Sequence, residues 1–270
     1  MTTLPPESPR VLRGILELTP AGTDRWLAPT PDEGPGRLFG GQVASQAIYA
    51  ATFTVSPDRL AHSLHSYFIR PGRPGVPLEL AVERTRDGRS FSTRRVVAAQ
   101  QGEPIFVLDS SFHVEEPADD WQATPLPDVP LPEELSDAMG GPSAFRRSNP
   151  FEIRPVRPTE GFGIHPCWVR VREPLEPEPS LHIAALTYVS DLAVVGSVRA
   201  PGSTAAWGGA SLDHAVWFHR PVRVDQWMLF SVDGVTNFGS RGLARGTFQR
   251  IDGTLVASLA QECLLRPTRI

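Results

Sequence analysis

The feature that most constrains this chain is an internal repeat whose two copies lie 150 residues apart. Tyr67-Phe68-Ile69-Arg70-Pro71 matches Trp217-Phe218-His219-Arg220-Pro221, with two aromatic residues, a spacer, arginine and proline in the same places. After a short insertion, Gly102-Glu103-Pro104-Ile105 aligns with Gly253-Thr254-Leu255-Val256. Because several matches follow one another at a nearly constant offset, we infer a duplication, and we expect both halves to fold in the same way.

Each half is expected to begin with a helix and to continue with strands. Apolar residues recur at helical spacing over Gly41–Thr52, and a matching helix is expected over roughly His182–Arg199, with Ser180 as its N-cap. Strand-like runs rich in Val, Phe and Tyr follow in the first half at Ser63–Ile69, Leu78–Arg86, Ser90–Gln100 and Pro104–His113. This order predicts an α+β unit in which an antiparallel sheet wraps around one helix.

Proline marks the boundary between the two halves. Nine of the 28 prolines fall in residues 115–160, with acidic residues between them. Proline has no backbone donor and a fixed φ, so this stretch can form neither a central strand nor a long helix. We therefore predict an N-terminal unit over residues 1–114, a crossing linker over residues 115–160 and a C-terminal unit over residues 161–270.

Composition excludes several classes of function. The chain carries 26 basic and 30 acidic residues, a net charge of −4, and has no basic tail, so we expect no nucleic-acid partner. All the basic residues are arginine, and the absence of lysine excludes a Walker-type phosphate loop and a pyridoxal Schiff base.

Compartment and metal binding are also constrained by the sequence. Cys167 and Cys263 are far apart and have no CxxC partner, so we expect no disulfide and no zinc site in a reducing compartment. Met1 to Arg10 has no apolar core of a secretory signal, and no stretch is apolar enough for a membrane span. The residues from Arg266 to Ile270 do not form a peroxisomal address. The expectation is a cytoplasmic protein with no membrane contact.

Five ordered blocks of the sequence resemble the acyl-CoA thioesterase II family. The blocks are Phe39–Val43, His62–Gly72, Arg86–Ser92, Ser211–Pro221 and Val256–Glu262. The resemblance extends from about Leu38 to Leu265 and implies a double hotdog fold, two tandem units that each wrap an antiparallel sheet around a central helix. It also implies hydrolysis of acyl-CoA to free fatty acid and CoA with no cofactor, and a homodimer or homotetramer.

The same resemblance assigns the catalytic residues. The family holds a nucleophilic water with an Asp, a Thr or Ser, and a Gln, which match Asp191, Ser211 and Gln261 of this chain. A thioester has a good leaving group, so a base that activates water and a donor for the oxyanion are sufficient chemistry. Our candidate for the oxyanion donor is the backbone N–H of Gly41, since this residue opens a helix and lets a substrate approach closely.

The repeat predicts one active site in each chain. At the offset of the repeat, the first-half residues that fall on Asp191, Ser211 and Gln261 are Gly41, Ala61 and Ser110. The first half therefore has no acid, hydroxyl or amide in register, and the polar triad comes from the second half.

Alternative interpretations of these residues stay open. Asp191 beside Ser190 could simply cap a helix. Ser211, Asp213 and His214 invite a Ser–His–Asp triad, but the GxSxG turn is absent, and strand alternation would place Ser211 and Asp213 on one face and His214 on the other. Asp213 followed by His219 loosely matches the Asp and His of a hotdog enoyl-CoA hydratase-like enzyme. The fold could also serve a non-catalytic acyl-CoA-binding protein.

Two further sets of residues have a structural and a functional interpretation. His62 and His65 are expected on opposite faces of a strand, which argues against a metal pair. A run of arginines flanks Asp87-Gly88 and is either a solvated hairpin face or a contact for the phosphates of CoA. This run consists of Arg84, Arg86, Arg89, Arg94 and Arg95.

Overall fold

The computed structural model describes residues 12–30, 36–137, 149–157, 164–200 and 207–267. In this part of the chain the first half contributes two helices and six strands. In chain order these are α1 (Leu12–Ile15), β1 (Thr19–Gly22), β2 (Arg25–Ala28), α2 (Gly40–Thr52), β3 (Arg59–Phe68), β4 (Leu78–Asp87), β5 (Phe91–Gln100) and β6 (Glu103–Val114).

The second half repeats this plan with additions before and after its long helix. In chain order its elements are η1 (Pro132–Glu134), β7 (Phe151–Pro155), β8 (Cys167–Val171), α4 (Pro179–Ser190), α5 (Val194–Ser197), β9 (Trp207–Ser211), β10 (Asp213–Phe218), β11 (Met228–Phe238), β12 (Arg241–Arg250) and β13 (Leu255–Pro267).

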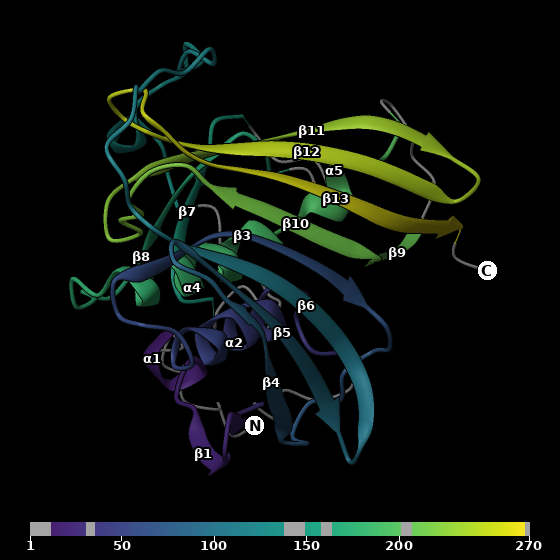
Figure 1. Cartoon of the computed structure of the whole chain (residues 1–270). Helices are drawn as coiled ribbons and strands as arrows, with labels where there is room; N and C mark the ends of the chain where they lie inside the picture. Colours follow the sequence, from purple (N-terminus) through teal and green to yellow (C-terminus); the bar gives the residue numbers. More distant parts are fainter. Residues whose placement is uncertain (1–11, 31–35, 138–148, 158–163, 201–206, 268–270) are drawn as a thin grey trace, which may run out of the picture.

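All the strands belong to one 13-stranded antiparallel sheet (Figure 1). Its order is β1-β2-β4-β5-β6-β3-β10-β13-β12-β11-β8-β7, with β9 paired to β13. The two halves meet at β3 and β10, where Leu64 lies opposite Val216. These are the strands that carry the matching aromatic segments of the repeat. The architecture is therefore the predicted α+β double hotdog, with two sheet units joined edge to edge.

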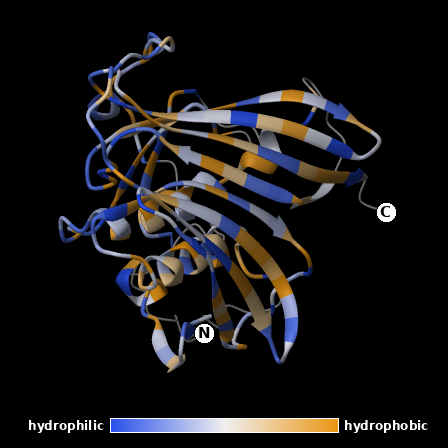
Figure 2. Ribbon diagram, in the orientation of Figure 1, coloured by the Kyte–Doolittle hydropathy of each residue, from blue (hydrophilic) through white to orange (hydrophobic). Residues whose placement is uncertain are grey.

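The helices α2 and α4 pack against each other and against the inner face of this sheet. In α4 every residue from Leu181 to Ser190 is buried, and α2 is buried over most of its length. In Figure 2 the strands carry alternating hydrophilic and hydrophobic bands, as expected where one face meets the core and the other meets solvent. This packing places the ends of the two helices beneath the sheet, where the candidate site forms.

The second helix differs from its predicted bounds. It spans Pro179–Ser190 rather than His182–Arg199, and its N-cap is Glu178 instead of Ser180. Asp191 follows the last helical residue as the C-cap, and Ala193 in the left-handed region (φ 58°) separates α4 from α5. The prediction missed this break because the apolar residues continue across it.

The helices consequently do not keep the 150-residue offset of the strands. Residues 53–58 connect α2 to β3, whereas the much longer stretch 191–206 connects α4 to β9. The C-cap of α2 is Phe53, so Asp191 corresponds to Phe53 and not to Gly41 as predicted. The extra residues after α4 shift the helix register without disturbing the strands.

Both repeats contain one extra residue at the same place in the sheet. In β3, Ala61 and Ser63 pair with consecutive residues of β6, so His62 has no residue opposite it. In the second half, Ser211 pairs with Cys263 and Ala215 pairs with Ala260 of β13. Between these pairs, three residues (212–214) face two residues of β13 (261 and 262). Such a bulge reverses the inward and outward alternation of side chains beyond it.

The bulge explains why the prediction for the two histidines of β3 is wrong. His62 packs edge-on against Phe91 and His113, with ring centroids 5.7 and 6.3 Å away. His65 packs against Trp217 at 5.2 Å. Because Phe91 and Trp217 are partly exposed, both histidines lie on the outer face of the sheet rather than on opposite faces.

The segment predicted as a linker covers part of the outer face of the second half. A small cluster of Trp168, Trp227 and Leu229 is packed beneath Leu126 and Val129 of this segment. The indole N–H of Trp168 donates to the carbonyl oxygen of Pro130 at 2.9 Å. The segment also contains β7, which forms one edge of the sheet. The exact domain bounds at residues 114 and 160 stay a prediction.

No helix among the described residues is long and apolar enough to cross a membrane. The expectations for Met1 to Arg10 and for the last residues, Thr268 to Ile270, concern segments outside the described part of the chain.

Candidate active site

Asp191 lies where the end of α4 meets the first turn of α2. Its side chain accepts three hydrogen bonds. The backbone N–H of Gly41 donates to Oδ2 at 2.9 Å, and the hydroxyl of Ser211 donates to Oδ1 at 2.9 Å. The amide Nε2 of Gln261 donates to Oδ1 at 3.0 Å. The partial positive charge of a helix N-terminus further favours an anion here.

Two glycines make this close approach between the helices feasible. A Cβ on Gly40 would lie 2.6 Å from Oδ2 of Asp191, and a Cβ on Gly41 would lie 2.1 Å from the carbonyl oxygen of Tyr188. Both distances are shorter than any side-chain carbon tolerates, so only glycine fits at these two positions. The Gly40-Gly41 pair therefore sets the distance at which Asp191 meets α2.

Strands β9 and β13 supply the other two polar groups. Gln261 is fully buried, and its Nε2 also donates to Oγ of Ser211 at 2.8 Å. The structure thus brings Asp191, Ser211, Gln261 and Gly41 into direct contact, although three come from the second half and Gly41 from the first. Their roles in catalysis stay predictions, and the N–H of Gly41 is here engaged by Asp191.

His214 also belongs to this cluster, although the sequence pattern suggests it only as part of a Ser–His–Asp triad. It is fully buried, with Nδ1 2.6 Å from Oε1 of Gln261 and Nε2 2.7 Å from Oγ of Ser190. The expected alternation placed it on the face away from Ser211, and this is wrong because the bulge lies between the two residues. The signal in the sequence was a histidine directly before the apolar run Ala215–Phe218.

Asp213 has a structural position beside the cluster. Its Oδ1 accepts the backbone N–H of Glu262 at 2.6 Å and so satisfies a donor that the bulge leaves without a strand partner. His214 bonds to Gln261 and Ser190, and Ser211 bonds to Asp191 and Gln261. The hydrogen bonds therefore do not form a Ser–His–Asp relay.

Burial controls the electrostatics of this cluster. It raises the pKa of the Asp191 carboxyl above its ordinary value, although nearby His214 and the hydrogen bonds from Ser211, Gln261 and Gly41 act in the opposite direction. Burial also lowers the pKa of the His214 imidazole. A carboxylate with a raised pKa is a stronger base, which suits a group that accepts a proton from water.

The arginine run has mainly structural contacts. Arg94 is 1% exposed, and its guanidinium donates to the backbone and side-chain oxygens of Thr54 and to the carboxylate of Asp87. Arg84 forms a two-pronged ion pair with Asp24. A contact of this run with the phosphates of CoA stays a prediction.

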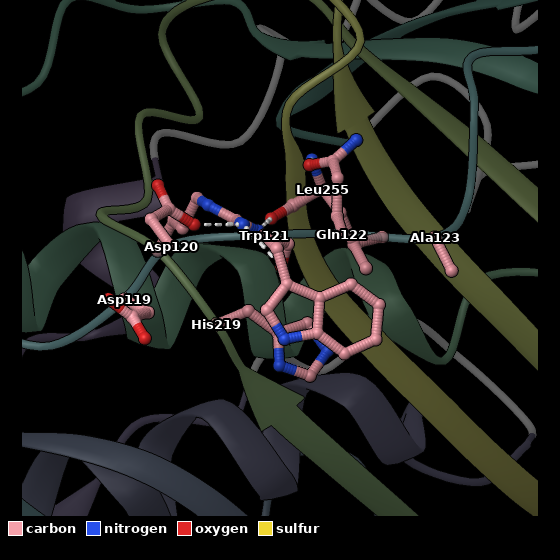
Figure 3. Close-up of a pocket in the computed structure, with 8 residues that line it drawn as sticks. Asp119, Asp120, Trp121, Gln122, Ala123, His219 and Leu255 are labelled. Atoms are coloured by element: carbon pink, nitrogen blue, oxygen red, sulfur yellow. Dashed lines mark hydrogen bonds and ion pairs between the residues drawn. The ribbon is translucent and has the colours of Figure 1, made fainter.

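A separate hollow of about 410 Å³ opens where the linker segment passes the start of β13 (Figure 3). It is lined by Asp119, Asp120, Trp121, Gln122, Ala123, His219, Arg220 and Leu255. Asp191, Ser211 and Gln261 are not among the lining residues.

The position of His219 bears on the hydratase-like alternative. Asp213 begins β10 and His219 follows its end, and six residues of strand span about 20 Å. His219 bonds to the hydroxyl of Ser258 at 2.8 Å. Asp213 and His219 are therefore too far apart to act on one substrate atom.

Among the described residues, no group of three or more His, Cys, Asp or Glu side chains could hold a metal ion.

Comparison with known proteins identifies the family of this chain. Residues 29–113 match the family model for the acyl-CoA thioesterase N-terminal domain, and residues 115–265 match that for the C-terminal domain. The chain belongs to the acyl-CoA thioesterase family. The family consists of thioester hydrolases.

Relatives of this thioesterase family come from animals and bacteria. Human acyl-coenzyme A thioesterase 8 is 38% identical over 260 residues, which cover 85% of this chain and 81% of the human protein. Acyl-CoA thioesterase 2 of Haemophilus influenzae is 32% identical, covering 87% and 90% of the two chains. The crystal structure of an acyl-CoA thioesterase II from Mycobacterium marinum has 36% identity and a TM-score of 0.82, covering 95% of this chain and 98% of that one.

Proposed function

We propose that this protein hydrolyses acyl-CoA thioesters to free fatty acid and CoA, with a water activated by Asp191, Ser211 and Gln261. The observation that supports this most directly is the buried carboxylate of Asp191, which has a raised pKa and accepts three hydrogen bonds from neutral groups. Family membership supports the reaction class and the acyl-CoA substrate.

The hydrogen bonds leave acceptor positions to which a water can bond. Oδ2 of Asp191 accepts one bond, from Gly41, and Oγ of Ser211 donates one bond and accepts one. Each oxygen keeps a lone pair to which a water can donate. Both N–H groups of Gln261 are engaged, so Gln261 contacts the water only by releasing Asp191 or Ser211, and otherwise it orients them.

The proposed reaction then balances in two steps. The water oxygen forms a bond to the thioester carbonyl carbon while its proton passes to Asp191. When the tetrahedral intermediate collapses, the C–S bond breaks, and the CoA thiolate receives that proton. The N–H of Gly41 can donate to the oxyanion only if its bond to Asp191 opens, which protonation of Asp191 favours because it weakens that bond.

The decisive experiment measures thiol release from short, medium and long acyl-CoA thioesters by the wild type and by Asp191→Asn. The variant keeps one acceptor oxygen but has no base, and we expect it to lose about 10²- to 10⁴-fold in kcat. Near-normal turnover by the variant would remove Asp191 from the mechanism. Tight binding of acyl-CoA with no turnover by the wild type would instead indicate a non-catalytic acyl-CoA-binding protein.

We further propose that the protein works in the cytoplasm without a cofactor, as a homodimer or homotetramer. Exposed aromatic side chains on the outer face of the two central strands support self-association, since Tyr67 is 64% exposed and Trp217 is 38% exposed. Light scattering after size exclusion tests this, and a monomer at micromolar concentration would contradict it.

A further inference from the structure

The side-chain amide of Gln261 has a defined orientation in the site. Its Nε2 lies within hydrogen-bond distance of Oδ1 of Asp191 and Oγ of Ser211. An ionised carboxylate can only accept, so the NH₂ end of the amide must face Asp191. The oxygen Oε1 therefore faces the opposite way, toward His214.

This orientation determines where the imidazole of His214 carries its proton. Nδ1 lies 2.6 Å from Oε1 of Gln261, and an amide oxygen can only accept. Two acceptors at this distance would repel, so Nδ1 must be the donor. Burial favours a neutral ring, which has one N–H, so Nε2 must accept from the hydroxyl of Ser190 at 2.7 Å. That hydroxyl then gives up its other acceptor, the carbonyl oxygen of Thr187 at 2.9 Å.

We propose that His214 is a positioning residue whose Nδ1–H holds the amide of Gln261 with its NH₂ group directed at Asp191 and Ser211. This inference rests on the proposed function, since it extends the site that acts on the water. Without this donor only its bonds to Asp191 and Ser211 hold the amide, and protonation of Asp191 during the reaction would let the amide turn its oxygen toward the carboxyl group. The base and the hydroxyl would both lose the group that holds them in place.

Two substitutions of His214 test the contributions of its two ring nitrogens separately. The Nδ2 of asparagine lies near the place of Nδ1, so His214→Asn can still donate to Gln261. The Nε2 of glutamine lies near the place of the ring Nε2, so His214→Gln can reach Ser190 but leaves Oε1 of Gln261 without a donor.

We expect H214Q to lose about 10- to 100-fold in kcat, the usual effect of removing a group that orients a functional residue. KM should change less than threefold, roughly, because no contact with acyl-CoA is altered. H214N should recover most of the lost kcat. Ser190→Ala, which removes the Nε2 contact but keeps the Nδ1 contact with Gln261, should lose less than H214Q. Equal losses in H214N and H214Q, or a larger loss in H214N, would overturn the proposal.

A spectroscopic measurement tests the proposal without turnover. In protein labelled with ¹⁵N-histidine, the resonance that disappears in H214N belongs to His214, and its Nδ1 should have the shift and the coupling of a protonated nitrogen. A bare Nδ1 with a protonated Nε2 would overturn the proposal, even if a variant is too unstable for kinetics. Failure of the wild type to hydrolyse any thioester would refute the proposed function, whereas the tautomer would still decide the role of His214.

Discussion

The two helix junctions beneath the sheet are equivalent by duplication, but they differ in chemistry. After α4, Asp191 accepts the N–H of Gly41 at the start of α2. After α2, the corresponding residue is Phe53, whose side chain is 51% exposed, and α4 begins with Pro179, which has no N–H to donate. Only the junction after α4 can bind an anion. We call it the second junction, because Asp191 belongs to the second half, and we call the junction after α2 the first junction.

The strands above the two junctions show the same contrast. In the first half Arg94 of β5 lies opposite Ser110 of β6, and in the second half Ala244 of β12 lies opposite Gln261 of β13. The guanidinium of Arg94 donates to Thr54, the residue after Phe53, much as Gln261 donates to Asp191. A large cation fills one half, and the small alanine leaves room for the polar cluster in the other.

The difference shows how a buried charge becomes structural or reactive. Arg94 is neutralised by Asp87 at 2.7 Å, so its charge is compensated and it holds the hairpin of β4 and β5 to α2. Among the described residues Asp191 has no arginine partner in an ion pair, and its donors are neutral. A buried anion compensated only by neutral donors keeps a high proton affinity, as a general base requires.

The largest effect on stability should come from the first junction. Arg94→Met removes the ion pair with Asp87 and the bonds to Thr54, and we expect a loss of roughly 3 kcal/mol in the free energy of unfolding. Thiol release at 25 °C should stay within about threefold of the wild type, since the active site lies in the other junction. Denaturant unfolding and the thioesterase assay measure both.

The neighbouring arginine provides a matched control for that variant. Arg95 follows in the same strand, but it is half exposed and lies 4.0 Å from Asp109. Arg95→Met should change the free energy of unfolding by less than about 0.5 kcal/mol. Equal destabilisation by the two variants would show that Arg94 is not the anchor described here.

At the second junction we expect a smaller loss of stability together with a loss of activity. In Gly41→Ala the added Cβ would lie 2.1 Å from the carbonyl of Tyr188, so α2 must move away from α4. We expect a loss of about 1–3 kcal/mol in stability, as for other overpacked sites. Because Asp191 would lose the N–H of Gly41, kcat should also fall at least tenfold, roughly. Gly14→Ala has no atom near its Cβ and serves as the control.

Much of the fold could be predicted from local pattern. The aromatic and Arg-Pro segments of β3 and β10 keep one offset because a strand ladder fixes register, and this revealed the duplication. The helix register could not be predicted in that way. The additional residues after α4 leave the apolar pattern uninterrupted, so the repeat aligned Asp191 with Gly41. The structure shows that Asp191 contacts Gly41 and that its equivalent in the first half is Phe53.

The candidate site was predicted less completely than the fold. Asp191, Ser211 and Gln261 came from the resemblance, and the structure brings them together. Regular alternation along the strand assigned His214 to the wrong face of the sheet. One bulged residue reverses the face to which each later side chain of the strand points. Arg94 was treated as one of a charged run, since the burial of a single arginine depends on Thr54, which is 40 residues away in the chain.

The pH dependence of stability provides the finest test of the contrast between the junctions. The pKa of Asp191 is raised in the folded protein by burial, so folding favours the protonated carboxyl. Its contribution to stability is therefore fully present below the unfolded pKa, near 3.8, and is lost as the pH rises through the higher folded pKa. Asp87 has the opposite sign, because hydrogen bonds from Ser92 and Arg94 lower its pKa, so its contribution is present above the unfolded value and lost in acid.

Asp191→Asn should therefore gain stability relative to the wild type as the pH rises from about 4 to 7, because only the wild type must keep a buried carboxylate ionised. Arg94→Met should show its full deficit at pH 7 and a smaller one in acid, where Asp87 becomes protonated in both proteins. Denaturant unfolding at several pH values gives the two curves. If Asp191→Asn were less stable at neutral pH and lost its deficit in acid, Asp191 would be a structural anion like Asp87, and the two junctions would differ only in shape.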